Sequence, residues 1–430
     1  LLDAVNYLLD AVKKGLISEK EIDTSVRRLL LAKFKLGLFD PSDKVKYAQI
    51  PYEINDSDTH RKLALKMARE SIVLLKNESS LLPLPKNLKS IAVIGPSAYD
   101  KKVLRGNYFG DSSRYVTILD GIREKISKKT KMYYTKGCDF LSEDVYSGGF
   151  SEALSMAKRA EAVIMCMGLS PILEGEENEV YLINKAGDRE NLNLPAIQEE
   201  LIKVIYSTGK PIILVLTNGS PLAISWEQEH IPAILESWYP GEEGGNAVAD
   251  VIFGDYNPAG RLPITFVKSL DQLPPFTDYS MRGRTYRYMN EAPLYPFGYG
   301  LSYTEFEYKN LTINPEKVKA GQSVKISVDV TNVGRVIGDE VVQLYLKHTQ
   351  TSAMVPNYEL KGFRRIHLKS GQTKRVIFNL SPKQMTIVND NGESILEAGK
   401  IKVMVGSSQP DKRSFELTGK KVLEKIFELV

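Results

Sequence analysis

Apolar and polar residues follow three successive patterns along this chain, and each pattern predicts a different kind of structure. Over residues 1–40, apolar residues recur at helical spacing in two stretches that Gly15 separates. Ser18 and Glu21 form the signature of a capping box at the start of the second stretch, which ends near Gly37. We expect two helices here. Their apolar stripes need a further surface, because a lone helical hairpin buries too little to be stable.

A second pattern follows the polar connector at 41–58. Near-continuous apolar runs, typical of strands buried on both faces, alternate with amphipathic helical stretches. The runs lie at 71–76, 90–95, 131–135, 162–167, 212–217 and 231–236, and the helical stretches at 60–69, 116–127, 150–160, 195–207 and 243–253. This alternation predicts a mainly parallel, layered α/β domain with right-handed crossovers. Ligand sites in such a domain collect beyond the carboxyl ends of the strands.

The third pattern, at 306–417, has a period of two with recurrent turn residues, which is typical of an antiparallel β-sandwich. For the charged, amphipathic end we expect a short helix. The predicted fold class is therefore an α/β layered sandwich domain with a mainly parallel sheet, followed by an antiparallel β-sandwich. The predicted parts are residues 1–40, 41–58 (linker), 59–305 (α/β domain), 306–417 (β-sandwich) and 418–430 (tail).

Composition narrows the classes of function. With 43% hydrophobic and 26% charged residues, the chain is neither disordered nor collagen-like. A net charge of +4 over 430 residues is too balanced to indicate a nucleic acid or an anionic membrane as partner. Cys138, Cys166 and four isolated histidines give no metal signature and no disulfide framework, so we expect no metal site. No apolar stretch reaches the roughly 18 residues that span a bilayer. A chain that begins in mid-helix cannot display a signal peptide, which leaves localisation open, and the sequence is compatible with a homodimer.

The segment that follows the run at 162–167 is the first candidate site. Its four carboxylates within six residues are Glu174, Glu176, Glu177 and Glu179. Clustered carboxylates raise one another's pKa, and a glutamic acid that stays protonated can act as a general acid on a leaving oxygen. A solvated acidic surface loop has the same composition, however, and Asp188 with Arg189 also fits a structural ion pair.

Two further clusters each allow two interpretations. In Trp238–Asn246, glycines permit a tight turn into the next helix. The N-terminus of that helix could bind an anion, or the turn could serve only to pack the helix. Trp238 and Tyr239 could stack on a sugar ring, although burial in the core is the favoured interpretation. The aromatic-rich stretch Tyr286–Tyr303 could line a carbohydrate groove or join two domains. We favour the second role, because the stretch lies at the junction of the α/β and β patterns.

These clusters belong to a longer series of motifs that resembles glycoside hydrolase family 3, the group that includes β-glucosidases and β-xylosidases. The motifs are Leu36–Pro41, Glu70–Glu78 with Leu82–Pro85, Gly187–Arg189 with Asn193–Pro195, Trp238–Gly245, Gly254–Pro263 and Tyr295–Thr304. Past Tyr303 the sandwich resembles the fibronectin type III-like domain of that family, with Glu359–Ile366 as the matching stretch. The resemblance covers nearly the whole chain.

The resemblance implies a retaining, exo-acting β-glycosidase that forms a covalent glycosyl-enzyme. Such an enzyme needs two carboxylates about 5–5.5 Å apart across the scissile bond. In the family the nucleophile is an Asp on a (β/α)₈ barrel, which would lie upstream of Leu1, so the nucleophile is not in this chain. Residues 1–40 resemble only the last helical segments of that barrel. The family's acid/base Glu comes from the loop that matches the acidic segment, where Glu176 fits best, with Glu177 and Glu174 as reserves.

The resemblance also suggests a substrate and a partner. Leu173–Glu177, with Arg105–Gly110, is most similar to the β-xylosidase branch. The resemblance therefore implies that the enzyme releases terminal non-reducing β-D-xylosyl residues, with β-D-glucosyl residues as the second expectation. The expected substrate is an oligosaccharide or another β-glycoside, and the expected partner is the missing N-terminal barrel, without which the chain would be inactive. The alternative is a non-catalytic module that binds carbohydrate or supports a separate barrel subunit.

Overall fold

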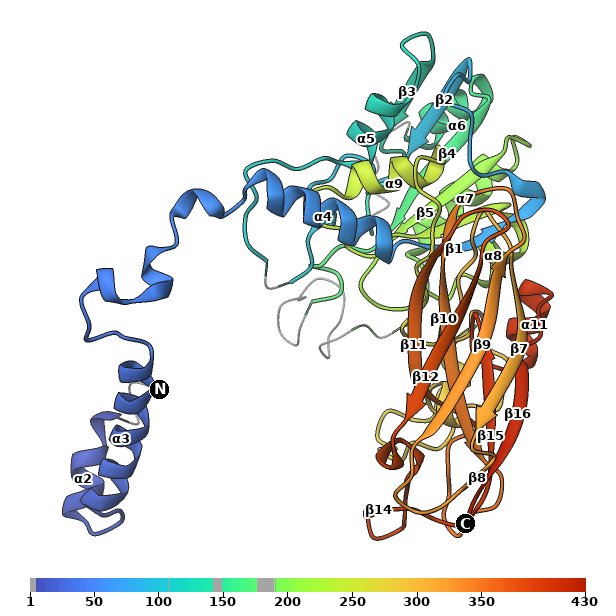
Figure 1. Cartoon of the computed structure of the whole chain (residues 1–430). Helices are drawn as coiled ribbons and strands as arrows, with labels where there is room; N and C mark the ends of the chain where they lie inside the picture. The colour runs from blue at the N-terminus through green and yellow to red at the C-terminus, as the bar shows by residue number, and fades with distance from the viewer. Residues whose placement is uncertain (1–4, 108, 142–148, 176–188, 190) are drawn as a thin grey trace. The chain divides into compact units, whose positions relative to one another are not determined.

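The computed structural model describes residues 5–107, 109–141, 149–175, 189 and 191–430, and the chain forms two units, Leu1–His60 and Arg61–Val430 (Figure 1). The first unit contains α2 (Leu8–Lys13) and α3 (Glu19–Lys35), followed by the 3₁₀ turns η1 (Ser42–Lys44), η2 (Lys46–Gln49) and η3 (Tyr52–Ile54). The predicted capping box is confirmed, because the Ser18 amide donates to Glu21 at 2.7 Å and the Glu21 amide donates to the Ser18 hydroxyl at 3.3 Å. No residue of either helix is buried.

The second unit begins with the α/β domain, whose sheet follows the predicted apolar runs. Its strands are β1 (Val73–Asn77), β2 (Ser90–Ile94), β3 (Lys131–Thr135), β4 (Ala162–Gly168), β5 (Ile212–Thr217) and β6 (Ala233–Glu236). Their order across the sheet is β1-β6-β5-β4-β2-β3. All neighbours pair in parallel except β1, which runs antiparallel to β6 at one edge. The mainly parallel α/β domain is therefore confirmed.

Helices cover both faces of this sheet, which explains why its strands are apolar on both sides. The helices are α4 (Asp58–Ser71), α5 (Ile118–Lys125), α6 (Gly149–Arg159), α7 (Ala196–Tyr206), α8 (Ser225–His230), α9 (Gly244–Ile252) and α10 (Thr285–Tyr288). Helices α6 and α7 bury their apolar stripes against one face, and α4, α5 and α9 bury theirs against the other. The short 3₁₀ turns η4 (Glu78–Ser80), η5 (Lys102–Leu104) and η6 (Leu270–Gln272) lie in the connections.

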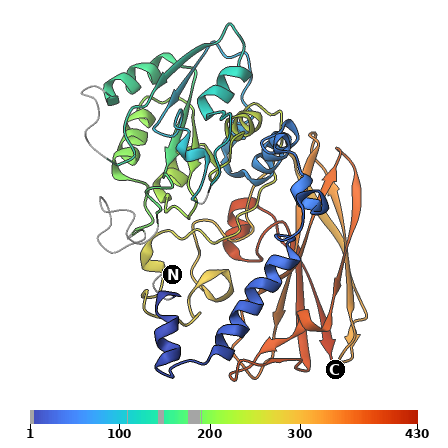
Figure 2. The same cartoon turned by 90° about the vertical axis from the view of Figure 1, so that its left-hand side faces the viewer.

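The β-sandwich packs two sheets around a core of its own, and both are antiparallel apart from the parallel pair of β8 with β16 (Figures 1 and 2). Its elements are β7 (Phe306–Asn314), β8 (Lys317–Val318), β9 (Val324–Asn332), β10 (Gly338–His348), β11 (Glu359–Leu368), β12 (Thr373–Leu380), η7 (Pro382–Met385), β13 (Ile387–Val388), β14 (Ser394–Ile395), β15 (Gly399–Gly406), α11 (Lys412–Thr418) and β16 (Leu423–Leu429). One sheet has the order β11-β10-β15-β16-β8, and the other has the order β12-β9-β7. The predicted sandwich is confirmed.

The helix predicted for the end of the chain is wrong, because Leu423–Leu429 forms the strand β16. Apolar Phe427 and Leu429 alternate with charged residues and point into the sandwich core. Strand β16 pairs along its length with β15, whose free edge would otherwise be exposed. A helical stripe and a strand period are hard to distinguish over seven residues, and here the vacant sheet edge decides the outcome.

Residues 286–303 join the α/β domain to the sandwich, as the favoured interpretation of this stretch predicts. The Tyr286 ring stacks on Phe297 with centroids 4.2 Å apart and also contacts Tyr345 of β10 edge-on. Gln343 of β10 donates to the Gly298 carbonyl at 2.9 Å. These contacts support the role of the stretch in joining the two domains.

Candidate active site

Three loops meet at the carboxyl ends of the adjacent strands β4, β5 and β6. Gly168 ends β4 opposite Thr217, the last residue of β5, and Leu216 lies opposite Glu236 at the end of β6. The two strands approach so closely that a Cβ added to Gly168 would lie 2.1 Å from the Thr217 carbonyl oxygen. Only glycine fits this position, which also has a φ of +134°. The loops that leave these ends are consequently neighbours in space.

Glu174 is firmly anchored at this edge. A helical turn after β4 presents it, because the Glu174 amide donates to the Ser170 carbonyl at 3.1 Å while Leu173 packs against the core. One carboxylate oxygen accepts the Gly219 amide at 2.7 Å and the Tyr239 hydroxyl. The other accepts the Ser220 amide at 2.9 Å and the Ser220 hydroxyl. The side chain is only 10% exposed, so these contacts replace most of its water.

Arg189 reaches the same point from the other end of the acidic segment. Its Nη1 donates to the Ser220 hydroxyl at 2.7 Å and to the Pro221 carbonyl at 3.2 Å. The same nitrogen lies 3.8 Å from the Glu174 carboxylate, and the arginine side chain is 13% exposed. Arg189 therefore forms an ion pair with Glu174. The ion pair expected between Asp188 and Arg189 stays a prediction, because Asp188 lies outside the described residues.

Tyr239 and Trp238 both face the protein. Burial raises the pKa of Tyr239 well above its usual range, and the adjacent Glu174 charge adds to that rise. Its ring lies against Gly219, where an added Cβ would lie 2.9 Å from a ring carbon. Trp238 donates through Nε1 to the Ser71 carbonyl at 3.1 Å, and its ring contacts Phe266 edge-on. The structure thus agrees with the core interpretation of these two rings.

Glu236 is a buried carboxyl at the same edge. It accepts the Trp238 amide at 2.9 Å and the Asn218 side-chain amide at 3.0 Å. Burial raises the pKa of Glu236 to about 8, and the Glu174 charge adds to the rise, whereas the two donors oppose it. At neutral pH this carboxyl is therefore mostly protonated, while the chain places four donors around its neighbour Glu174.

The glycine turn before α9 serves packing. Gly241 has a left-handed φ of +79°, and the Gly245 amide donates to the Val116 carbonyl at 2.9 Å. A Cβ at Gly245 would lie 1.9 Å from the Thr117 carbonyl oxygen, so α9 begins in tight contact with the start of α5. This outcome supports the packing alternative and not the anion site.

Only some of the predicted site residues lie among the described residues. Glu176, Glu177, Glu179 and Asp188 lie outside the described residues, whereas Glu174 and Arg189 lie inside. Sequence reasoning missed Ser220 and Glu236. The only signal for Ser220 is its place directly after a buried strand, in a sheet where ligand sites lie at such ends. Glu236 ends an apolar run and has no local signal.

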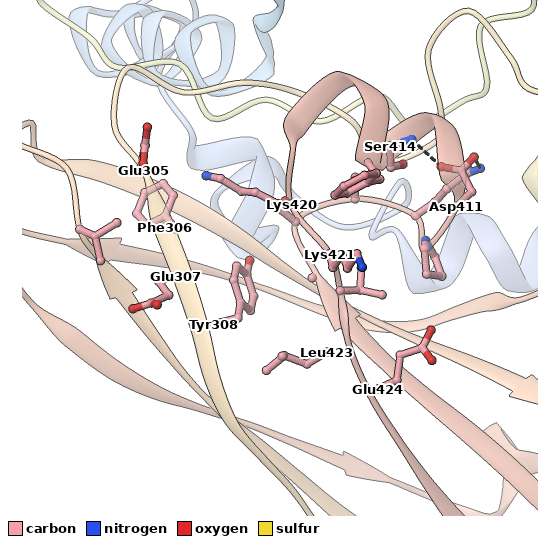
Figure 3. A pocket seen from close by; sticks show the side chains of 18 residues that line it. Glu305, Phe306, Glu307, Tyr308, Asp411, Ser414, Lys420, Lys421, Leu423 and Glu424 are labelled. Atoms are coloured by element: carbon pink, nitrogen blue, oxygen red, sulfur yellow. Dashed lines mark hydrogen bonds between the residues drawn. The ribbon is translucent and has the colours of Figure 1, made fainter.

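A cavity of about 960 Å³ lies elsewhere, in the sandwich between β7, β16 and α11 (Figure 3). Phe306 and Tyr308 of β7 line it together with Lys420, Lys421 and Leu423, and no residue of the three loops takes part. Over the described parts of the chain, no three His, Cys, Asp or Glu side chains are grouped in a way that would hold a metal ion. Within the same ranges no helix is both long and apolar enough to cross a bilayer.

Comparisons with known proteins agree with this architecture. Residues 72–303 match the glycosyl hydrolase family 3 C-terminal domain, and residues 340–409 match a fibronectin type III-like domain. The chain is 41% identical to a β-xylosidase of Formosa agariphila and 37% identical to a periplasmic β-glucosidase of Salmonella typhimurium. Each alignment covers 96% of this chain but only 58% and 57% of the two relatives. A β-glucosidase of Listeria innocua, solved with glucose, superimposes with a TM-score of 0.83 at 30% identity, over 98% of this chain and 56% of that one. The chain belongs to glycosyl hydrolase family 3.

Proposed function

We propose that this chain is the acid/base half of a retaining, exo-acting β-glycosidase that releases terminal non-reducing β-D-xylosyl residues, with β-D-glucosyl residues as the second choice. The observation that supports this most directly is the attachment of both ends of the acidic segment, through Glu174 and Arg189, to Ser220 at the carboxyl edge of the sheet. This is the edge where α/β domains hold their ligands. A solvated surface loop would not need two partly buried anchors.

Glu176 is the proposed general acid/base. It follows the anchored Glu174 by two residues in the sequence. Glu174 itself is a poor candidate, because both of its oxygens already accept donors from the protein. An acid has to turn an O–H toward the leaving oxygen of the substrate. Glu177 is the next candidate after Glu176.

The reaction has two steps with complementary proton transfers. In the first step a carboxylate nucleophile bonds to the anomeric carbon while the glycosidic C–O bond breaks, and Glu176 gives its proton to the departing oxygen. In the second step the Glu176 carboxylate takes a proton from water as that water attacks the anomeric carbon, and the nucleophile leaves. Neither step needs a metal or a cofactor.

The nucleophile is proposed to come from a barrel domain that this sequence does not include. The chain spans between half and two thirds of the relatives described above. We therefore expect the 430-residue chain by itself to be inactive, or nearly so. The preference for xylose is supported by the 41% identity to a protein named β-xylosidase, compared with 37% to one named β-glucosidase.

The test uses the polypeptide as its gene encodes it, assayed with aryl β-xylosides and β-glucosides. Glu176→Gln should lower kcat/KM by about 10²-fold to 10⁴-fold with a leaving group that needs a proton, and much less with a dinitrophenyl leaving group. Azide should partly restore turnover to Glu176→Ala. Glu177→Gln is the matched control, and if it shows these effects in place of Glu176→Gln, the acid/base assignment moves to Glu177.

A second measurement separates the enzyme from the non-catalytic module. The mass of the natural polypeptide and of anything that co-purifies with it can be determined directly. A natural chain that starts near Leu1 and purifies without a barrel-containing subunit would contradict the glycosidase proposal. The chain would then be a module that binds carbohydrate or supports another protein.

A further inference from the structure

We propose that Glu174 and Arg189 form a clamp on Ser220, supported by Tyr239 through its bond to Glu174, that this clamp positions the acidic segment, and that Glu174 is a positioning residue and not the acid itself. This inference rests on the proposed function, because it assigns a role relative to Glu176. It explains why one of the glutamates in the acidic cluster is held by the protein. It also gives Tyr239 a role that does not involve stacking on a sugar.

Both carboxylate oxygens of Glu174 are saturated with hydrogen-bond donors. Two N–H and two O–H groups point at its two oxygens, and three of these four donors belong to Gly219 and Ser220. A carboxylate surrounded in this way is anchored in one orientation, because rotating it would break several charge-assisted hydrogen bonds at once. Those bonds connect the end of the turn after β4 to the loop after β5.

The other end of the acidic segment, at Arg189, is bonded to the same serine, Ser220. Arg189 donates to the Ser220 hydroxyl, which in turn donates to Glu174, so a single serine links the start and the return of the acidic segment. Just beyond Arg189, the Ala223 amide donates to the Leu192 carbonyl at 2.7 Å. Both ends are therefore tied to residues 219–223.

The loop after β5, to which both ends are bonded, is itself held rigidly. Asn218 is fully buried, and its side-chain amide donates to the Ser220 carbonyl at 2.9 Å and to Glu236. Tyr239 is held against Gly219 by its ring and reaches Glu174 with its hydroxyl. The clamp thus connects the loops after β4, β5 and β6, all of which start from buried strands.

Such a clamp affects catalysis through distance. The acid must lie within hydrogen-bond reach of the glycosidic oxygen, and a displacement of about 1 Å can cost about 10²-fold in rate. Loss of an anchor two residues away from Glu176 should therefore weaken proton donation. It should leave hydrolysis of substrates that need no proton nearly intact.

The experiment compares Tyr239→Phe and Glu174→Gln with the matched control Tyr303→Phe in the polypeptide as its gene encodes it. Tyr303 also donates a partly buried hydroxyl, to the Val251 carbonyl at 2.8 Å, but it does not touch Glu174. Tyr239→Phe removes one oxygen and keeps the ring. In Glu174→Gln, one side-chain N–H₂ group must face a backbone N–H donor.

The readout is kcat/KM for an aryl glycoside with a poor leaving group and for a dinitrophenyl glycoside. We expect about a 10-fold loss in Tyr239→Phe and about a 10²-fold loss in Glu174→Gln with the poor leaving group, and less than about a 3-fold loss with the dinitrophenyl substrate. The control should change neither. If Glu174→Gln does not fold, Tyr239→Phe decides the question.

Three results would overturn the clamp. Equal losses with both substrates would indicate a general structural role, and no loss in either variant would remove the role altogether. Azide rescue of Glu174→Ala, together with an unaffected Glu176→Gln, would make Glu174 the acid. A failure of the clamp is distinct from a failure of the proposed function, because Glu176→Gln and the mass of the natural polypeptide test the latter without changing a clamp residue.

Discussion

Replacing Glu236 by Gln should remove a steep pH dependence from the stability of the α/β domain. Glu236 is completely buried, and its carboxyl has two hydrogen-bond donors but no cationic partner among the contacts described above. Burial raises the pKa of this carboxyl from 4.5 to about 8. In the unfolded chain the same group ionises in water near the lower value.

The sign of the effect follows from counting protons. Between pH 4.5 and pH 8 the folded protein keeps a proton on Glu236 that the unfolded chain has lost. Unfolding therefore releases a proton, and the free energy of unfolding falls as the pH rises, by up to about 1.4 kcal/mol per pH unit. This contribution to stability is fully present below the unfolded pKa and is lost as the pH rises to the folded pKa. Between pH 5 and pH 8 the loss amounts to about 3 to 4 kcal/mol.

The assay is urea unfolding followed by tryptophan fluorescence at pH 5, 6, 7 and 8. The two tryptophans, Trp226 and Trp238, both lie in the α/β domain, so the sandwich does not contribute to the signal. The free energy of unfolding of the wild type minus that of Glu236→Gln should decrease across this range by the amount given above. The fixed cost of placing an amide in the site cancels in the slope. Glu200→Gln on the exposed side of α7 is the matched control for the chemical change.

Parallel stability curves for the wild type and Glu236→Gln would refute the reasoning. They would mean that Glu236 is already ionised in the folded protein. A difference that increases with pH would refute it as well, because it would require a stabilised carboxylate at this position.

Three other predictions follow from particular residues. The same experiment with Glu227→Gln should give a difference that decreases only up to about pH 7, because burial raises the pKa of Glu227 to about 7. Gly168→Ala should lower the free energy of unfolding by about 3 kcal/mol or more or prevent folding. Gly209→Ala should cost about 1 kcal/mol, because Gly209 also has a positive φ, +69°, but has open space around it. Urea unfolding measures both, and equal costs would contradict the steric argument. Cys138 and Cys166 should react with a thiol reagent only after denaturation, because burial raises the pKa of both thiols.

The fold of the α/β domain could be predicted because each of its strands is buried on both faces. The run Ile212–Thr217 has no polar residue before its last position, and all six of its residues are buried. A continuous apolar run of this length has few structures open to it other than a central parallel strand. The end of the chain was harder to predict, because β16 is a strand only by virtue of the open edge of β15 beside it.

The candidate site was predictable in place but not in detail. The strand ends indicated the edge of the sheet at which Glu174, Ser220 and Glu236 lie, and the resemblance indicated the acidic segment. No local pattern distinguishes Glu174 from its neighbours, since all of them follow the same strand and are equally acidic. The hydrogen-bond partners of Glu174 lie 45, 46 and 65 positions away along the chain, at Gly219, Ser220 and Tyr239.

Distant neighbours also decide which carboxyl groups at this edge of the sheet are charged. Glu236 ends a buried strand, and there burial outweighs two donors and keeps the group mostly neutral at pH 7. Glu174 lies one loop away with four donors and an arginine, and its charge in turn helps to keep Glu236 protonated. A short stretch of sequence contains the carboxylates but not the donors around them. Those donors separate a carboxylate that anchors a loop, as Glu174 does, from one that is free to transfer a proton.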